Sequence, residues 1–166
     1  MTSERHSQPE PAAPPLGAAI RIRPFAPTDQ AAARQLILTG LGEHFGFIDE
    51  TLNPDLEDIH TAYSLRGDCF VVAVIAEEVV GTGALIVEEP GIGRLVRMST
   101  SAHHRRRGIG RALVAHLIEA GRTRGLRRLV IETNDDWNDA IGLYLATGFT
   151  EIARGDGSVH LARDLG

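Results

Sequence analysis

Short runs in which apolar residues dominate or alternate with polar ones recur along this chain, and such runs are typical of strands. Between them lie stretches in which apolar residues return every three or four positions, as on the packed face of a helix. The predicted strands are residues 20–23, 69–76, 79–88, 94–101, 128–133, 150–154 and 158–163. The predicted helices are residues 28 or 29 to about 41, 54–65, 108–124 and 139–146.

The order of these elements is strand, two helices, three strands, helix, strand, helix and two strands. It predicts an α/β (α+β) fold with a single mixed central sheet of about six to seven strands, flanked by about four helices. The apolar faces predicted for the first and third helices consist of Ala32, Leu36, Ile37 and Leu41, and of Leu113, Leu117 and Ile118. Residues 40–53 are rich in glycine and are predicted to form a loop or a broken helix.

The composition favours one soluble domain. The length of 166 residues suits a single domain, predicted here over residues 19–166 after a disordered tail at residues 1–18. The formal net charge of −5 argues against broad binding to nucleic acid or anionic lipid, and it mildly favours cationic partners. Cys69 is the single cysteine, which excludes an internal disulfide. The apolar runs are too short to cross a bilayer, so we expect a cytoplasmic protein with no membrane partner.

The segment from His103 to Leu113 carries the clearest chemical signal, because a glycine-rich turn there leads from a predicted strand into a predicted helix. The first turn of a helix exposes unpaired backbone N–H groups, and it carries partial positive charge. Gly108 and Gly110 would let a phosphate approach those groups, and nearby arginines add charge. The alternative is a solvated basic turn. Neither the dinucleotide fingerprint nor the Walker motif is met.

The pattern Arg105-x-x-Gly108-x-Gly110 resembles the coenzyme A signature of the GNAT superfamily of N-acetyltransferases. Residues 97–100 resemble the central strand of that family, and residues 140–149 resemble its last helix and the strand after it. The resemblance covers about residues 20–165. It implies the GNAT fold, acetyl-CoA as co-substrate, and transfer of the acetyl group to a primary amine of a small molecule or peptide in a ternary complex.

The resemblance also assigns the binding of the cofactor. The pantetheine arm is expected along the central strand and the pyrophosphate on the turn, held mainly by backbone N–H groups. The residues implied for these contacts are Met98, Ser99, Thr100, Arg105, Arg106, Arg107, Gly108, Ile109, Gly110 and Arg111. One GNAT subgroup has an asparagine where this chain has Trp137, and Asn138 would take its place beside the arm after a small shift.

Two residues are predicted to be catalytic. Tyr144 matches the family tyrosine that protonates the departing thiolate, although it also fits a buried helix aromatic. Glu132 matches the glutamate that acts as general base in the ribosomal-protein N-terminal acetyltransferases, although it also fits a strand glutamate that faces solvent or pairs with an arginine. Glu43 and His44 are the alternative bases. The chain departs from the family pattern at two places. The first is Trp137, and the second is Thr100-Ser101-Ala102, the segment before the glycine-rich turn.

Other functions stay open at this point. A non-catalytic acyl-CoA-binding or regulatory module has the same sequence signals, and a thioesterase-like or other nucleotide-binding enzyme is a more distant reading. The seven histidines lack the spacing of a metal site, so no metal is expected. The amine acceptor and the acyl chain length are not readable, and a homodimer built on the last hairpin is possible.

Overall fold

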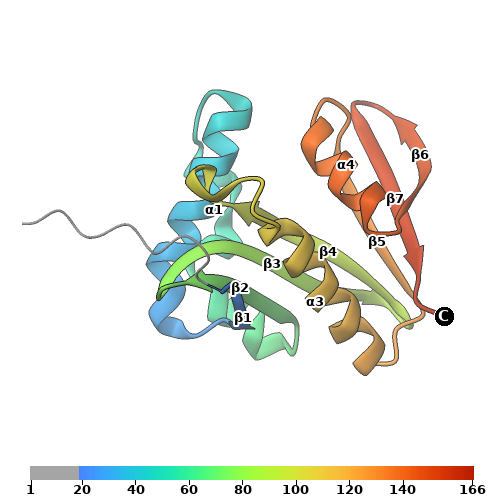
Figure 1. Ribbon diagram of the computed structural model, residues 1–166, viewed down its shortest axis with the longest axis horizontal. Helices are drawn as coiled ribbons and strands as arrows, with labels where there is room; N and C mark the ends of the chain where they lie inside the picture. Colours follow the sequence, from blue (N-terminus) through green and yellow to red (C-terminus); the bar gives the residue numbers. More distant parts are fainter. Residues whose placement is uncertain (1–18) are drawn as a thin grey trace, which may run out of the picture.

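The computed structural model describes residues 19–166, and the predicted tail at residues 1–18 lies outside them. Within this range seven strands form one sheet in the order β1-β2-β3-β4-β5-β7-β6 (Figure 1). The strands are β1 Arg21–Pro24, β2 Cys69–Ile75, β3 Glu78–Glu89, β4 Ile92–Thr100, β5 Arg128–Asn134, β6 Thr150–Gly155 and β7 Ser158–Asp164. The α-helices are α1 Gln30–Phe45, α2 Ile59–Ala62, α3 Ile109–Thr123 and α4 Asn138–Ala146. The predicted single mixed sheet is confirmed.

The sheet lies between two layers of helices, with α3 and α4 on one face and α1 and α2 on the other (Figure 1). Strand β2 contributes to both cores, because its alternate residues point to opposite faces. On the α3 face lie Val71, Ala73 and Ile75, and on the α1 face lie Phe70, Val72 and Val74. Burial on both faces explains why this strand reads as a continuous apolar run in the sequence.

Strands β4 and β5 form the only parallel pair among the described strands, and their pairing is short. The crossover between them is α3, as a parallel connection requires. The register covers Ile92↔Arg128, Gly93↔Leu129 and Arg94↔Val130, and it stops there. Beyond Arg94 the two strands diverge, so the edge of β4 that faces β5 has no strand partner. This divergence positions the site described below.

The sequence predicts a loop or a broken helix over residues 40–53. The loop is wrong over residues 40–45, which continue α1 as a helix, and the helix breaks at the left-handed Gly46. The reason is close packing, since a Cβ on Gly40 would stand 3.2 Å from Ser99 Oγ on β4. The predicted apolar face of this helix is partly wrong: Ile37 is buried and Leu41 packs against the core as expected, but Ala32 is exposed, and the other buried residues are Ala33 and Leu38. The predicted face of α3 is confirmed.

The single helix predicted over residues 54–65 is wrong. The structure has a 3₁₀ turn at Pro54–Glu57, the short helix α2, and a second 3₁₀ turn at Ser64–Arg66. Asp58 interrupts the run with extended backbone, and its side chain accepts a hydrogen bond from the N–H of Thr61 at 3.1 Å. A short side chain that caps a new helix competes with continuation of the old one, and it divides this segment into short turns.

Candidate functional site

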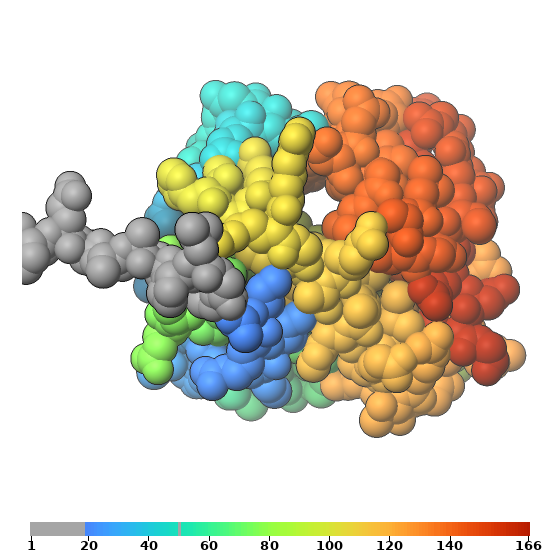
Figure 2. All heavy atoms as spheres, in the orientation of Figure 1, coloured from blue at the N-terminus to red at the C-terminus, as the bar shows by residue number. Residues whose placement is uncertain are grey.

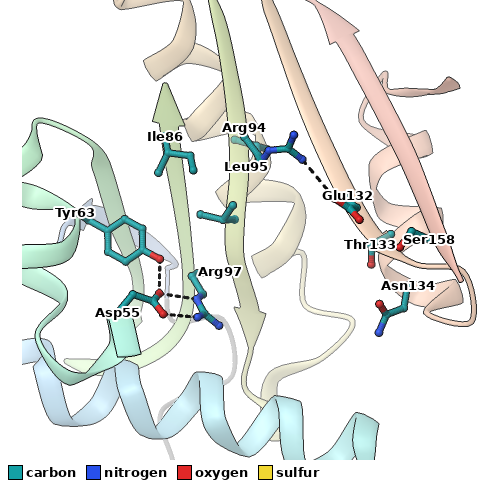
Figure 3. A pocket seen from close by; sticks show the side chains of 11 residues that line it. Asp55, Tyr63, Ile86, Arg94, Leu95, Arg97, Glu132, Thr133, Asn134 and Ser158 are labelled. Atoms are coloured by element: carbon teal, nitrogen blue, oxygen red, sulfur yellow. Dashed lines mark hydrogen bonds and ion pairs between the residues drawn. The ribbon is translucent and has the colours of Figure 1, made fainter. Parts of the chain in front are cut away.

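Two cavities meet at the gap between β4 and β5. The larger, about 1000 Å³, is lined by α3, α4, the turn before α3 and the C-terminal half of α1. The smaller, about 530 Å³, lies beside the 3₁₀ segment that contains Asp55 (Figure 3). The residues that line both cavities are Leu95, Val96, Arg97, Glu132 and Thr133. In the space-filling view a hollow separates the yellow residues before and at the start of α3 from the orange residues of α4 (Figure 2).

The larger cavity brings together most of the residues predicted to bind a cofactor. Those that line it are Met98, Ser99, Thr100, Arg105, Arg106, Gly108, Ile109, Gly110, Arg111 and Asn138. Arg107 is exposed and is not among the lining residues. The N-terminus of α3 therefore opens onto a cavity that also carries Arg105, Arg106 and Arg111 near this end, which is an arrangement that attracts an anionic group.

Gly108 and Gly110, at the start of α3, are required to be glycine for different structural reasons. Gly108 adopts φ +79°, and a Cβ there would meet no heavy atom within 4 Å, so its requirement is conformational and the space beside it is open. A Cβ on Gly110 would stand 2.9 Å from Leu143 Cδ2 of α4. The absence of a side chain at Gly110 thus allows α3 and α4 to pack closely, a role that the sequence did not indicate.

The C-terminal end of α1 reaches across the larger cavity and contacts both of its other walls. Glu43 forms an ion pair with Arg105 of the turn at 2.6 Å. The ring of His44 stacks on Trp137 with centroids 4.2 Å apart and an interplanar angle of 13°, and its Nε2 lies 3.4 Å from Asp136 Oδ1. Glu43 and His44 therefore lie on a helix and not in a loop. They line the larger cavity but not the smaller one.

Tyr144 is buried in α4 and lines the larger cavity. Its side chain is 5% exposed, and its ring makes an edge contact with Phe149 at 6.0 Å. Burial raises the pKa of the Tyr144 hydroxyl to about 12. The phenol is therefore fully protonated near neutral pH and is able to donate a hydrogen bond into the cavity.

Glu132 lies at the junction of the two cavities, on the β5 side of the gap. Its side chain is 48% exposed. The carboxylate has two long contacts, one to Arg94 Nη1 at 3.9 Å (Figure 3) and one to His160 Nε2 at 3.9 Å. Both distances exceed the length of a hydrogen bond, so the carboxylate keeps the capacity to accept one from a ligand.

The wall of the smaller cavity contains a polar cluster that the sequence gave no reason to expect. Asp55 accepts hydrogen bonds from Arg97 Nε at 2.9 Å and Nη2 at 2.6 Å, and from the Tyr63 hydroxyl at 2.5 Å (Figure 3). Burial favours the neutral carboxyl, but the hydrogen bonds from Arg97 and Tyr63 outweigh it and hold the pKa of Asp55 below its usual value. Burial and the neighbouring carboxylate raise the pKa of Tyr63 to about 12.

His104 is a second residue that the sequence did not single out. Its side chain lines the larger cavity directly before the arginines of the turn, and it is 7% exposed. Within the described part of the chain, its buried Nδ1 has no hydrogen-bond partner. An unpaired buried nitrogen is energetically unfavourable.

Residues 19–166 contain no group of three or more His, Cys, Asp or Glu side chains placed to hold a metal ion. Over the same range, no helix has the length and apolar character needed to cross a membrane.

Comparison with known proteins identifies relatives of the chain. Residues 37–149, more than half of its length, match the Acetyltransferase (GNAT) family. N-acetyltransferase 8B of Rattus norvegicus is 40% identical over 114 residues, which make up 65% of this chain and 51% of that protein. The chain spans about half the length of the curated relatives that it matches.

Solved structures share the fold. An acetyltransferase of the GNAT family from Staphylococcus aureus superposes with a TM-score of 0.82 at 26% identity, over 89% of this chain and all of that one (100%). The PaiA N-acetyltransferase from Thermoplasma acidophilum, solved in complex with coenzyme A, gives a TM-score of 0.74 at 12% identity, over 88% of this chain and 99% of that one. The fold expected from the sequence is thereby confirmed.

Proposed function

Because the chain belongs to the acetyltransferase (GNAT) family, we propose that it transfers an acetyl group from acetyl-CoA to a primary amine of a small molecule or peptide. The observation that carries this proposal is the meeting of two cavities at the gap between β4 and β5. Two substrates that enter from separate cavities can react directly only where those cavities join. The names of the relatives, which are N-acetyltransferases, support the same reaction.

The residues of the larger cavity fit an acyl-CoA. The open space at Gly108, the first turn of α3 and the arginines of the turn suit a pyrophosphate. The unpaired edge of β4 from Leu95 to Thr100 offers backbone N–H and C=O groups to the amides of a pantetheine arm. When bound, the cofactor supplies a thioester carbonyl that an amine can attack.

In the proposed reaction, Glu132 receives the proton of the amine. An aliphatic ammonium has a pKa near 10, so it must lose a proton before it can attack. Glu132 lines both cavities, and its carboxylate is not engaged in a short hydrogen bond. Backbone N–H groups of β4 near Met98 stabilise the negative charge that develops on the thioester oxygen.

Tyr144 stabilises the departing thiolate from α4, in the wall of the larger cavity. An ordinary thiol has a pKa near 8.5, whereas that of Tyr144 is about 12. We therefore assign Tyr144 the donation of a hydrogen bond to sulfur, and solvent supplies the proton of the final thiol.

The test is calorimetric titration with acetyl-CoA and with ADP, followed by detection of thiol release in a panel of amines. Acetyl-CoA should bind much more tightly than ADP, which lacks the arm expected along β4, and thiol should appear only when an amine is present. No binding of acetyl-CoA at millimolar concentration would reject the proposal. Binding without amine-dependent thiol release would instead support the non-catalytic acyl-CoA-binding module. A cytoplasmic location and a homodimer stay predictions.

A further inference from the structure

Arg97 has a backbone conformation that is unusual for a strand residue. It lies inside β4 with φ +55°, in the left-handed region that residues other than glycine rarely adopt. The register between β3 and β4 shifts at this point, from Thr82↔Ser99 to Ala84↔Val96. A residue held in such a conformation needs surroundings that determine it, and it often marks a functional position.

The bulge at Arg97 changes the direction of the strand's side chains. Val96 packs against the core on the α1 face, and Arg97 reaches Asp55 on the same face, although neighbouring residues normally alternate. Met98 then packs against the core on the α3 face. The peptide groups between Val96 and Met98 are thus turned away from regular strand geometry at the place where the two cavities meet.

Four contacts from other segments hold Arg97 in this state. Its guanidinium donates two hydrogen bonds to Asp55, at 2.9 and 2.6 Å (Figure 3), and one from Nη1 to Asn53 Oδ1 at 3.1 Å. Its backbone carbonyl accepts a hydrogen bond from the buried hydroxyl of Thr82 at 2.7 Å. Tyr63 donates to Asp55 and fixes the carboxylate in turn. Both the guanidinium and the backbone carbonyl of Arg97 are therefore restrained.

These contacts occupy three of the five N–H groups of the Arg97 guanidinium and pair its charge with a carboxylate. Its Nε, Nη1 and Nη2 all donate to Asp55 or Asn53, and its side chain is 19% exposed. Neutralisation by Asp55 raises the pKa of Arg97 in spite of its burial, so the pair stays ionised. Arg97 lines both cavities, and its backbone conformation sets the direction of the neighbouring peptide groups there.

We propose that Asp55, Asn53 and Tyr63 clamp Arg97, and that this clamp fixes the direction of the β4 backbone groups that the acetyl transfer proposed above requires. Arg97 is then a positioning residue and not a catalytic one. The clamp also ties the 3₁₀ segment on the wall of the smaller cavity to the strand that receives the cofactor, and these two parts are 42 residues apart in the chain.

Two substitutions at the same position separate the backbone role from the loss of the side chain. Arg97→Gly and Arg97→Ala both remove every clamp contact, but glycine adopts a positive φ freely and alanine does not. We expect kcat of Arg97→Ala to lie about five- to thirtyfold below that of Arg97→Gly. The Kd of ADP, which lacks the arm expected along β4, should differ between the two variants by no more than about threefold, because the phosphate turn is a separate element. Equal kcat values in the two variants would overturn the proposal.

Asp55→Asn tests the clamp from the other end, since it removes the charge and keeps the size. In the wild-type background it should lower kcat about tenfold, and in the Arg97→Gly background it should lower kcat no further. An equal loss in both backgrounds would show that Asp55 does not act through Arg97. Glu119→Gln is the matched control, because Glu119 pairs with Arg122 on α3 and lines neither cavity.

A structural measurement decides the proposal even if no amine is acetylated. The three-bond HN–Hα coupling and the backbone chemical shifts of residue 97 report its φ in isotope-labelled protein. They should show a positive φ in the wild type and a shift towards strand values in Asp55→Asn. A positive φ that persists unchanged in Asp55→Asn would refute the clamp. Failure of acetyl transfer in the wild type would instead reject the proposed function.

Discussion

The exchange of Tyr144 for phenylalanine tests the chemistry assigned to the larger cavity. Tyr144 is 5% exposed, and its ring packs edge-on against Phe149 at 6.0 Å. Phenylalanine keeps this ring contact and removes only the hydroxyl. No hydrogen bond from that hydroxyl to another described residue is present in the structure, so the change should leave the fold intact.

The size of the effect follows from the role proposed for the hydroxyl. A hydrogen bond to a charged group contributes about 1.5–3 kcal/mol, which corresponds to about a 10- to 150-fold decrease in kcat when it is lost. Full proton donation by Tyr144 is not expected, because its pKa of about 12 lies well above that of a thiol. The Kd of acetyl-CoA should change by less than about threefold, since the thiolate charge develops only during the reaction.

The assay is thiol release under saturating acetyl-CoA and amine, with Kd measured separately by calorimetry. The pH dependence adds a second check. The protonated phenol is the active form, and its pKa is raised, so Tyr144 should cause no decrease in kcat as the pH rises from 7 to 10. A kcat of Tyr144→Phe within twofold of wild type, or a loss that appears entirely in Kd, would refute the role assigned to this hydroxyl.

Three further predictions follow from the structure. Glu132→Gln should lower kcat/KM by about 10²- to 10⁴-fold with acetyl-CoA affinity retained, as calorimetry and thiol release would show; activity like that of wild type would exclude Glu132 as the base. Gly108→Ala should lower the free energy of unfolding by about 1–2 kcal/mol in urea because Gly108 has φ +79°, whereas Gly142→Ala, with no heavy atom within 4 Å of the added Cβ, should not. Arg23→Ala should lower the free energy of unfolding by about 2 kcal/mol at pH 7, because Arg23 donates two hydrogen bonds to the buried Asp29. The hydrogen bond from Arg23 holds the pKa of Asp29 below its usual value, so this stabilisation is present above about pH 4 and is lost as the pH falls through the folded pKa; a difference between wild type and variant that persists at pH 2 would contradict this.

Local signals in the sequence were sufficient for the strands, for α3 and α4, and for the residues that line the larger cavity near the start of α3. The strand before the turn, the glycine at the start of α3 and the apolar face of α3 depend on residues close together in the chain. The same holds for Tyr144, which a short motif in one helix identifies. These features arise from backbone geometry and helix periodicity, which neighbouring residues determine.

Features that depend on distant contacts could not be predicted. The glycines at the end of α1 indicated a loop, but the missing side chain of Gly40 lets the helix approach Ser99. Asp55 and Arg97 meet across 42 residues, and no local pattern joins them. The left-handed φ of Arg97 is likewise invisible, because nothing in its own sequence neighbourhood requires it.

The most direct test of the account is mass spectrometry after incubation of the protein with isotope-labelled acetyl-CoA, with and without the best amine of the panel. Direct transfer through the gap between β4 and β5 predicts that the amine gains the labelled acetyl group and that the protein gains none when the amine is omitted. An amine that stays unmodified, or a labelled acetyl-protein that accumulates without amine, would contradict the account.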